Sequence, residues 1–463
     1  MTPGVKLLFR NITSRTNIAF LRFRLDTLGE NFIYEESGHF RRYSPVVLCG
    51  KVERLNKEIS CYCYEDFAKL YNPRWPVFPK SQKGIYAKGI TAYKEIIKKK
   101  NVRLIHAQFL TDAIFCYQLI KDSQMPVVIS LRGYDLFVPP ARSFLPKIIP
   151  FVSKFTVKSE SMKNELISFG CPPEKIEVIY GGINIDKIIF KPRIADKSNI
   201  KILCAGRFVD KKGHDTSLKA FSRILKKYPN SQMTLIGEGK LRDHLIKLID
   251  QLGIAANVSL KGYLPHPAFI KELYRHNFFL LSSRTAKNGD KEGIPNVLKE
   301  AMASGMPVVS TYHSGIPELI TDKETGYLVN ENDHQGILDK VDFILKNEDA
   351  AFRTCLNARF FVEKKFDAKK TAGQIERLYD YLLMPDHAQS TIDVINGKKP
   401  KEFRADLHLI QGCNSQCGMC DNWKNDVRTS FSRKDVSRVL EDLKSFGVNY
   451  VRFHGQEPTL RKD

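Results

Sequence analysis

The sequence has few cysteines and no long apolar run, and each shortage excludes a class of protein. Its 463 residues include only 10 cysteines, of which seven are scattered, so a disulfide framework is not expected. No run of about 18 apolar residues is present, which argues against a transmembrane helix. The start of the chain lacks the apolar core of a secretion signal. These shortages together predict a cytoplasmic protein.

The chain also has fewer acidic than basic residues. The chain has 73 basic and 51 acidic residues, which gives a formal net charge of +22 at pH 7. Such a balance favours anionic partners, such as phosphorylated ligands or an anionic membrane. No arginine-rich arm or RNA-binding signature is present, so nucleic acid is not expected as a partner. The basic excess suits peripheral contact with the inner face of a membrane.

Short apolar segments alternate with segments of helical period along most of the chain. The predicted strands form two series, at residues 102–109, 126–133, 154–160 and 176–182, and then at 199–208, 232–239, 257–264, 277–284 and 306–313. Strand–helix alternation indicates parallel sheets with helices on both faces. The sequence thus predicts an α/β fold with two doubly wound, Rossmann-like domains, which bind ligands beyond the carboxyl ends of their strands.

The chain divides into four predicted parts. The first series belongs to a domain at residues 1–192, and the second to a domain at 193–383, because a polar, pattern-poor segment separates them. The second domain closes with the helix FDAKKTAGQIERLYDYLL. Residues 384–402 are interpreted as a linker, and residues 403–463 as a further unit that begins a strand–helix pattern.

The segment KEGIPNVLKEAMASGMPVVST carries the strongest chemical signal of the second domain. Glu292 and Glu300 are separated by seven residues, with Glu292 just before a predicted helix that opens at Pro295 and Asn296. Proline suits a first helical turn because its missing N–H costs nothing there. The free N–H groups of that end form a site for an anion.

Cations follow the first strand of the second series. The segment AGRFVDKKGHD places Arg207, Lys211 and Lys212 at the edge of the sheet where ligands bind. No Asp-x-Asp pair that would hold a metal stands out. We therefore expect a nucleotide-diphosphate site in which positive side chains take the metal's role and stabilise the departing diphosphate.

These motifs together resemble the donor site of family 4 glycosyltransferases, which are retaining enzymes of the GT-B fold, and most of all the colanic-acid type that builds envelope polysaccharides. The resemblance covers about residues 100–383 and includes LIGEGKLRDHL and VKSESMKNELISFGCPPEKIEVIYGGIN. It implies no cofactor for sugar transfer, and catalytic roles for Glu292, Arg207 and Lys212. The donor-binding residues that it implies are Gly206, Arg207, Lys212, Gly237, Glu292, Gly293, Ile294, Pro295, Asn296 and Glu300.

The acceptor half departs from the family pattern. Where family members often carry His-x-His, this chain has His106 and Gln108, and where they often carry His-Gly-x-Asp it has an arginine, Arg132, followed by Asp135. His106 is interpreted either as a catalytic residue that faces the donor sugar or as a buried strand-end histidine. Arg132 either holds an anionic acceptor phosphate or only pairs with Asp135.

The remaining three cysteines, Cys413, Cys417 and Cys420, lie in the segment CNSQCGMC after a predicted strand. Zinc normally takes four ligands, whereas an iron–sulfur cluster tolerates three cysteines if its remaining iron binds something else. The spacing resembles the opening of radical S-adenosylmethionine enzymes. That resemblance implies a 4Fe-4S cluster on these cysteines and S-adenosylmethionine at a later turn formed by Gly455, Glu457 and Pro458.

The unit after residue 403 is too short for a complete barrel, which takes about 250 residues. We therefore expect an incomplete βα-barrel fragment of a truncated, split or frameshifted gene, in which the cluster need not be functional.

The sequence as a whole predicts a retaining glycosyltransferase that moves a sugar from a nucleotide-diphosphate sugar to an envelope glycan or lipid-linked acceptor. One alternative is a radical S-adenosylmethionine enzyme whose first half is a sugar-binding module. A third interpretation, a binder of sugar nucleotides without catalysis, is disfavoured by the intact set of Arg207, Lys212, Glu292 and Glu300.

Overall fold

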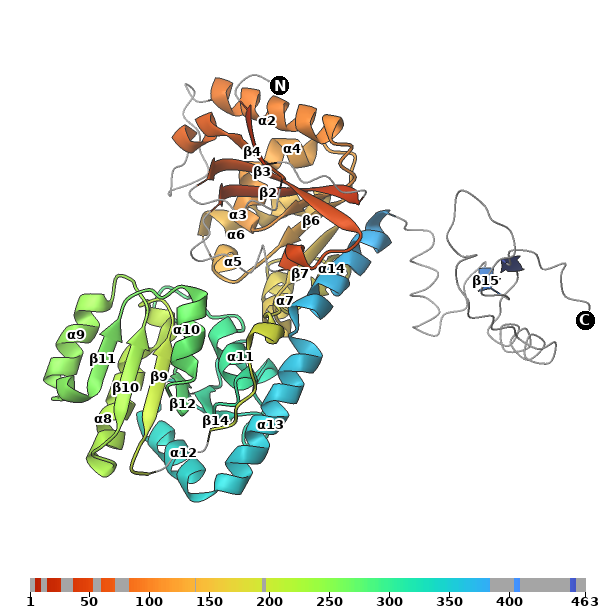
Figure 1. Ribbon diagram of the computed structural model, residues 1–463. Helices are drawn as coiled ribbons and strands as arrows, with labels where there is room; N and C mark the ends of the chain where they lie inside the picture. The colour runs from red at the N-terminus through yellow and green to blue at the C-terminus, as the bar shows by residue number, and fades with distance from the viewer. Residues whose placement is uncertain are drawn as a thin grey trace, which may run out of the picture. The chain divides into compact units, whose positions relative to one another are not determined.

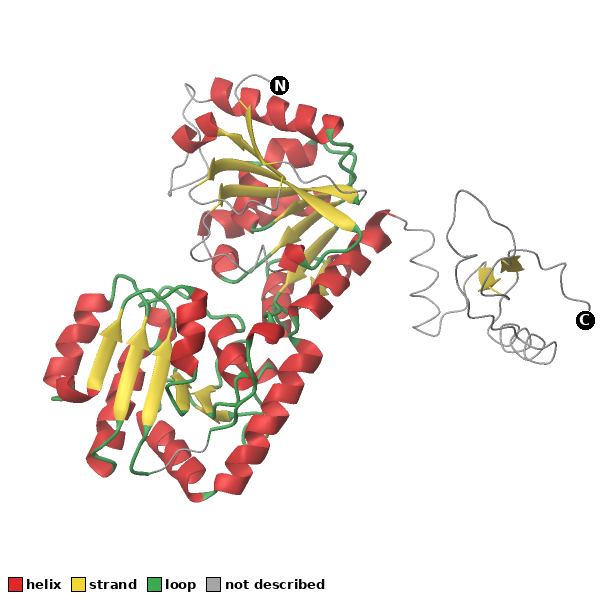
Figure 2. Ribbon diagram, in the orientation of Figure 1, coloured by secondary structure: helices red, strands yellow, loops and turns green. Residues whose placement is uncertain are grey.

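The computed structural model describes residues 5–9, 15–25, 36–52, 60–70, 83–137, 139–193, 197–383, 404–408 and 450–454. The chain divides into two compact units, Met1–Tyr379 and Asp380–Asp463. The first unit contains two parallel sheets covered by helices (Figures 1 and 2). We call the sheet of β1–β8 with its helices the first lobe, and the sheet of β9–β14 with its helices the second lobe.

The first lobe is built on an eight-stranded sheet in the order β1-β4-β3-β2-β5-β6-β7-β8. All neighbours pair in parallel except β1, which runs antiparallel to β4 at the edge. The chain order reverses between β2 and β5, so the sheet is doubly wound. The strands are β1 (Val5–Phe9), β2 (Thr16–Leu25), β3 (Tyr43–Val52), β4 (Ser60–Tyr64), β5 (Ile105–Ala107), β6 (Val127–Ser130), β7 (Lys154–Val157) and β8 (Ile176–Val178).

Helices of the first lobe connect these parallel strands. They are α2 (Lys83–Lys99), α3 (Leu110–Phe115), α4 (Tyr117–Lys121), α5 (Tyr134–Phe137), α6 (Pro139–Ile148) and α7 (Glu160–Ser168). The apolar face of α2, with Tyr93 and Ile96, packs into one core with Ala19 and Leu21 of the central strand β2. Alternate residues of β2 therefore point to this helical layer, as the two-residue period of a strand requires.

The second lobe has a six-stranded, wholly parallel sheet in the order β11-β10-β9-β12-β13-β14. Numbered from β9, this is the 3-2-1-4-5-6 order of a dinucleotide-binding domain, with its switch point between β9 and β12. The strands are β9 (Lys201–Ala205), β10 (Gln232–Ile236), β11 (Val258–Lys261), β12 (Phe278–Leu281), β13 (Val308–Thr311) and β14 (Tyr327–Val329).

Both faces of the second sheet are covered. Along β9, Leu203 belongs to one apolar core and its neighbours Ile202 and Cys204 to the other. The first core is closed by α10 (His266–Leu273), α11 (Asn296–Ala303) and α13 (Glu348–Lys365), and the second by α8 (His214–Lys227), α9 (Arg242–Gln251) and α12 (His334–Lys346). The prediction of two doubly wound domains is thus confirmed. The junction predicted at residue 192 falls between β8 and β9.

The helix α14 (Ala368–Leu383) follows the second lobe in sequence but returns to the first (Figure 1). Its Glu376 carboxylate accepts hydrogen bonds from the backbone N–H groups of Arg41, at 2.8 Å, and Arg42, at 2.7 Å. The ring of Tyr379 packs edge-on against Phe40. The helix predicted at the end of the second domain is therefore present and ties the two lobes together.

Glu318 forms a second tie between the lobes. It lies in the second lobe, yet its carboxylate accepts hydrogen bonds from the backbone N–H groups of Glu160, at 2.8 Å, and Ser161, at 3.0 Å, at the start of α7. The hydroxyl of Tyr180 also donates to it, at 2.9 Å. A carboxylate at a helix N-terminus satisfies free donors and complements the helix dipole.

We expect Glu318→Ala to lower the free energy of unfolding by about 1–2 kcal/mol, because the change leaves two N–H groups of α7 without their acceptor. Urea denaturation measures the loss. The control is Glu324→Ala, which removes an exposed carboxylate from the same lobe. Equal stability of the two variants would show that the cap contributes nothing.

In the second unit the structure describes residues 380–383 at the end of α14 and the strands β15 (Arg404–His408) and β16 (Tyr450–His454). They pair in parallel, with Arg404 opposite Tyr450. The first of these strands was predicted before the cysteines, and a parallel pair is what a strand–helix–strand connection produces. Two strands do not support a barrel, so the predicted barrel fragment has no support beyond this pair.

Candidate functional site

The turn after β9 brings two glycines of the predicted donor site together. β9 ends at Ala205 and continues through Gly206 and Arg207 into the short 3-10 helix at Asp210–Lys212. A Cβ atom built on Gly237, which follows the neighbouring strand β10, would lie 2.0 Å from the Gly206 carbonyl oxygen. Only glycine fits this approach, so the two strand ends pack directly beside the switch point.

An ion pair joins two of the predicted catalytic residues. Lys212 Nζ lies 2.6 Å from Glu292 Oε2, and both side chains are largely buried. Burial alone would raise the pKa of Glu292, but the charges of Lys212, Lys211 and Arg207 outweigh it and lower the pKa to about 2. Glu292 is therefore ionised at physiological pH and serves as a hydrogen-bond acceptor rather than a proton donor.

A histidine that the sequence did not single out fixes the backbone at Glu292. The Glu292 N–H donates to His313 Nε2 at 3.0 Å, and His313 Nδ1 lies 2.5 Å from Glu331 Oε1. Since Nε2 accepts, Nδ1 carries the proton and the ring is neutral. Burial lowers the pKa of His313, which agrees with a neutral ring. This chain of contacts positions the Glu292 loop.

The three cations after β9 differ in their surroundings. Lys211 is buried, and its Nζ donates to Asp290 Oδ1 and to the Lys291 carbonyl oxygen, both at 3.0 Å. The Arg207 side chain is exposed and makes no hydrogen bond or ion pair with any residue that the structure describes. Lys211 therefore shapes the loop, whereas Arg207 and Lys212 are the side chains placed to meet a ligand.

Helix α11 begins where the sequence predicted. Pro295 occupies the N-cap position, and the N–H groups of Leu298 and Lys299 both point to its carbonyl oxygen, at 3.2 and 3.5 Å. The N–H groups of Asn296 and Val297 have no acceptor in the part of the chain that the structure describes. Gly293 and Ile294 lead into this end of the helix, so the backbone presents free donors just after Glu292.

Glu300 lies on the buried side of α11. Its Oε1 atom is 2.8 Å from His266 Nε2 at the start of α10. Its second carboxylate oxygen has no hydrogen-bond partner among the residues that the structure describes. The structure thus brings Gly206, Lys212, Gly237 and Glu292 together at one end of the sheet, with Glu300 on the helix that follows.

His106 lies at the end of β5 in the first lobe and is completely buried. Its Nδ1 atom is 2.5 Å from the Tyr379 hydroxyl, and its Nε2 atom is 2.8 Å from Ser130 Oγ. Burial lowers the pKa of His106 to about 3, so the ring is neutral. Both ring nitrogens have partners within the protein. A catalytic role would require one of these hydrogen bonds to be exchanged for a substrate.

Asp135 and Arg132 form one turn after β6. The Asp135 carboxylate accepts from the backbone N–H of Leu110 at 3.0 Å, which caps α3, and from that of Arg132 at 2.9 Å. The Arg132 guanidinium turns elsewhere: Nη2 donates to Gln108 Oε1 at 2.7 Å and lies 3.4 Å from Glu36 Oε1. Arg132 therefore contacts more than Asp135, because its guanidinium also meets Gln108 and Glu36.

Both lobes match models of known protein families. Residues 184–359 match the family described as "Glycosyl transferases group 1", and residues 40–187 match "Glycosyltransferase Family 4". Each lobe therefore matches the model of a glycosyltransferase family. The two matches meet between β8 and β9, at the junction of the two sheets.

Curated relatives agree with these glycosyltransferase domains. The chain is 37% identical over 225 residues to the amylovoran biosynthesis glycosyltransferase AmsK of Erwinia amylovora, a match that covers 48% of this chain and 55% of the relative. It is 34% identical over 183 residues to the putative colanic acid biosynthesis glycosyltransferase WcaL of Escherichia coli, which covers 40% and 45%. The chain spans about half the length of the curated relatives it matches.

Solved structures share the arrangement of the glycosyltransferase domains. The Anabaena protein HepE, in complex with UDP and glucose, matches with a TM-score of 0.63 at 19% identity, over 80% of this chain and 100% of its own. Sucrose-phosphate synthase of Thermosynechococcus elongatus matches with a TM-score of 0.66 at 18% identity, also over 80% and 100%. At such identities the likeness shows the fold alone.

The glycosyltransferase domains contain two buried lysines that the sequence did not single out. Lys158 follows β7, and Lys299 lies on α11 next to Glu300. Two sequence signals could have identified them. Lys158 stands at the carboxyl end of a predicted strand. Lys299 lies inside the donor motif, at a helix position that normally carries a buried apolar residue.

The predicted tail site lies outside the described residues. This applies to Cys413, Cys417 and Cys420, and to Gly455, Glu457 and Pro458. Among the residues that the structure does describe, no group of three or more His, Cys, Asp or Glu side chains is arranged to hold a metal ion. In the same residues, no helix is both long and apolar enough to span a membrane.

Proposed function

We propose that the chain is a retaining glycosyltransferase of the GT-B type, which transfers a sugar from a nucleotide-diphosphate sugar to an envelope glycan or a lipid-linked acceptor. One observation carries the proposal: Lys212, which follows β9 together with the exposed Arg207, pairs with Glu292 just before the free N–H groups at the start of α11. Glu292 links them, because it pairs with Lys212 and lies four residues before α11 begins. Ligands of doubly wound sheets bind at this switch point.

The chemistry follows from the charges. Transfer breaks the bond between the anomeric carbon and a phosphate oxygen, and negative charge gathers on the departing diphosphate. Arg207, Lys212 and the N–H groups of Asn296 and Val297 are donors placed to stabilise that charge. Because these groups are held by the fold before the reaction begins, they need little rearrangement in the transition state.

Glu292 and Glu300 supply acceptors for hydroxyl groups. Glu292 stays ionised beside Lys212, so it can accept from a hydroxyl of the donor sugar while it orients the lysine. Glu300, fixed by His266, can accept from the ribose. Retention of the anomeric configuration follows from the resemblance to family 4 enzymes. The names of the amylovoran and colanic acid relatives support an envelope polysaccharide as the product.

A panel of UDP-, GDP- and ADP-sugars tests the proposal. We expect the full chain to release nucleoside diphosphate from one of these donors, slowly with water and faster with an acceptor glycan. Nuclear magnetic resonance of the product should show the anomeric configuration of the donor. If the folded chain neither binds nor turns over any sugar nucleotide, the proposal is wrong.

The tail is expected to be dispensable for transfer. Neither family match extends beyond residue 359, and α14 completes the first unit of the fold. A chain that ends at Met384 should therefore transfer sugar at the rate of the full chain, measured with the same donor and acceptor. A folded but inactive truncated chain would show instead that residues 385–463 take part in transfer.

A further inference from the structure

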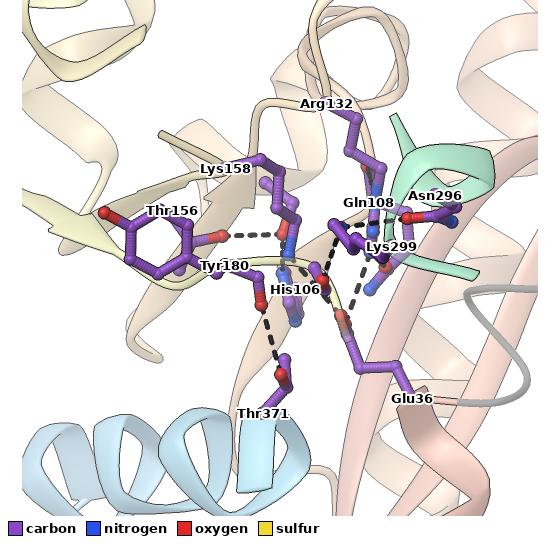
Figure 3. Close-up of polar contacts among 12 residues, drawn as sticks. Glu36, His106, Gln108, Arg132, Thr156, Lys158, Tyr180, Asn296, Lys299 and Thr371 are labelled. Atoms are coloured by element: carbon purple, nitrogen blue, oxygen red, sulfur yellow. Dashed lines mark hydrogen bonds and ion pairs between the residues drawn. The ribbon is translucent and has the colours of Figure 1, made fainter. Parts of the chain in front are cut away.

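A buried group of charged side chains lies where the first lobe meets α11 (Figure 3). Arg132 follows β6, Lys158 follows β7, and Lys299 reaches in from the second lobe, around the carboxylate of Glu36. We call these four residues the basic cluster. The carboxyl ends of β6 and β7 thus provide two of its cations, at the edge of the first sheet where a ligand would bind.

The basic cluster holds more positive than negative charge. Arg132 and Lys158 share the Glu36 carboxylate, at 3.4 Å each, which is long for an ion pair. Lys299 Nζ donates to two uncharged acceptors, the Gly181 carbonyl oxygen at 2.6 Å and Asn296 Oδ1 at 3.0 Å. Three cations therefore surround one shared carboxylate.

Burial makes this excess of charge costly. The side chain of Lys158 is 10% exposed, and Lys299 is 1% exposed. Burial lowers the pKa of Lys158 to about 8 and that of Lys299 to about 7, and the positive charges of the cluster contribute to both shifts. A buried cation without a full counter-charge costs several kcal/mol.

A neighbouring amide also lacks a partner. Gln108 is completely buried, and its Oε1 atom accepts from Arg132 Nη2 at 2.7 Å. Its Nε2 atom has no hydrogen-bond partner among the residues that the structure describes. Buried donors are nearly always satisfied, so an unsatisfied one beside the basic cluster indicates an acceptor that the protein alone does not supply.

We infer that the basic cluster binds an anionic group, a phosphate or a carboxylate, that the acceptor carries. The inference rests on the proposed function, because it assigns the acceptor's charge to the first lobe. The donor's diphosphate already has its own donors after β9 and at the start of α11. An anion between Lys158 and Lys299 would supply the missing negative charge and accept from Gln108, and it would do so next to Asn296, where α11 begins.

The test measures anion binding by calorimetry with nucleoside diphosphate present at saturation, so that the donor site is filled. The probes are sulfate, inorganic phosphate and glucuronate, and the variants are Lys158→Met and Lys299→Met. We expect the wild type to bind phosphate or glucuronate, and each variant to bind at least about tenfold more weakly. Which of the two probes binds more tightly distinguishes a phosphorylated acceptor from an acidic sugar.

Two further readouts separate a binding role from a structural one. The melting temperature of Lys299→Met without ligand should equal or exceed that of the wild type, because a buried charge is removed. The affinity for nucleoside diphosphate should stay within about twofold of the wild type in both variants. If the methionine variants do not fold, Lys158→Gln and Lys299→Gln take their place in the same assays.

Binding should also depend on pH. Sulfate keeps its charge between pH 6 and 9, so its affinity reports on the protein. Lys299 and Lys158 lose their protons as the pH rises through about 7 and 8, and affinity should fall over that window. The other groups that face them do not titrate there: the pKa of Glu36 is lowered, that of His106 is about 3, and Arg132 stays charged. The Glu300 carboxylate also acts on Lys299 and is paired with His266.

Each contrary result has a distinct meaning. Anion binding that is absent from the wild type, or unchanged in both lysine variants, overturns the inference. Loss of nucleotide binding in these variants, with anion binding kept, assigns the cluster to the donor and also overturns it. A chain that binds the anions through these lysines but binds no nucleotide would instead contradict the proposed function.

Discussion

Lys212→Ala is expected to lower the rate of sugar transfer by about 10²–10³, the loss seen when one fixed donor is removed from a transition-state oxyanion site. The change removes the cation that we propose to face the departing diphosphate. It also leaves Glu292 without the partner that lies 2.6 Å away. The measurement is the initial rate of nucleoside diphosphate release at saturating donor and acceptor.

Two matched variants show whether the loss is specific. Lys219→Ala removes an exposed cation from α8 in the same lobe and should leave the rate unchanged. Lys212→Arg keeps the charge but changes the geometry, so it should recover part of the rate. A Lys212→Ala protein with normal turnover and normal nucleotide affinity would refute the assignment of this lysine to the diphosphate.

Gly213→Ala should have the largest effect on stability. Gly213 has φ +61°, and a Cβ atom there would lie 1.8 Å from the Ser282 carbonyl oxygen at the end of β12. The left-handed backbone costs about 1–2 kcal/mol for alanine, and the overlap adds a similar amount or more. We therefore expect the free energy of unfolding to fall by about 2–5 kcal/mol.

Gly253 provides the control for this second prediction. Its φ is +67°, almost that of Gly213, but no atom lies within 4 Å of an added Cβ. Gly253→Ala should therefore show only the backbone cost, about 1–2 kcal/mol. Chemical denaturation of both variants separates the two contributions. Equal losses of unfolding free energy in the two variants would mean that the backbone at the start of α8 shifts away from β12 at little energetic cost.

The second lobe could be predicted from sequence because its signals are local. Five of its six strands were predicted from their apolar residues, and Pro295 and Asn296 marked the start of α11 within a residue. Only β14 was overlooked, since Tyr327–Val329 is too short to show a period. The motif also located the pair of Lys212 and Glu292, although the ion pair joins residues 80 positions apart.

The first lobe was harder to predict because its order depends on pairing between distant segments. β1 and β4 are short strands on one side of the sheet, and β1 to β4 all precede the first strand predicted from the sequence. The site residues there act through tertiary contacts: His106 meets Tyr379, which lies 273 positions later. No local sequence pattern predicts a partner so distant in the chain. Both interpretations of His106 were therefore open until the fold placed α14 beside β5.

The basic cluster shows the same limit at the candidate site. Lys158 and Lys299 come from different lobes, and no local sequence pattern shows that their side chains lie close together. Only the fold buries them around Glu36, in a position where their charge needs a counter-ion. His313 was overlooked for a related reason, since its role is to hold the Glu292 backbone rather than to match a motif.

Calorimetric titration of the full chain with UDP, GDP and ADP tests the central claim most directly. The account predicts that one of the three binds at a single site, that Arg207→Ala and Lys212→Ala each weaken it at least about tenfold, and that Lys219→Ala does not. A folded chain that binds none of the three, or that binds one equally well in all of these variants, would contradict a nucleotide-sugar site after β9.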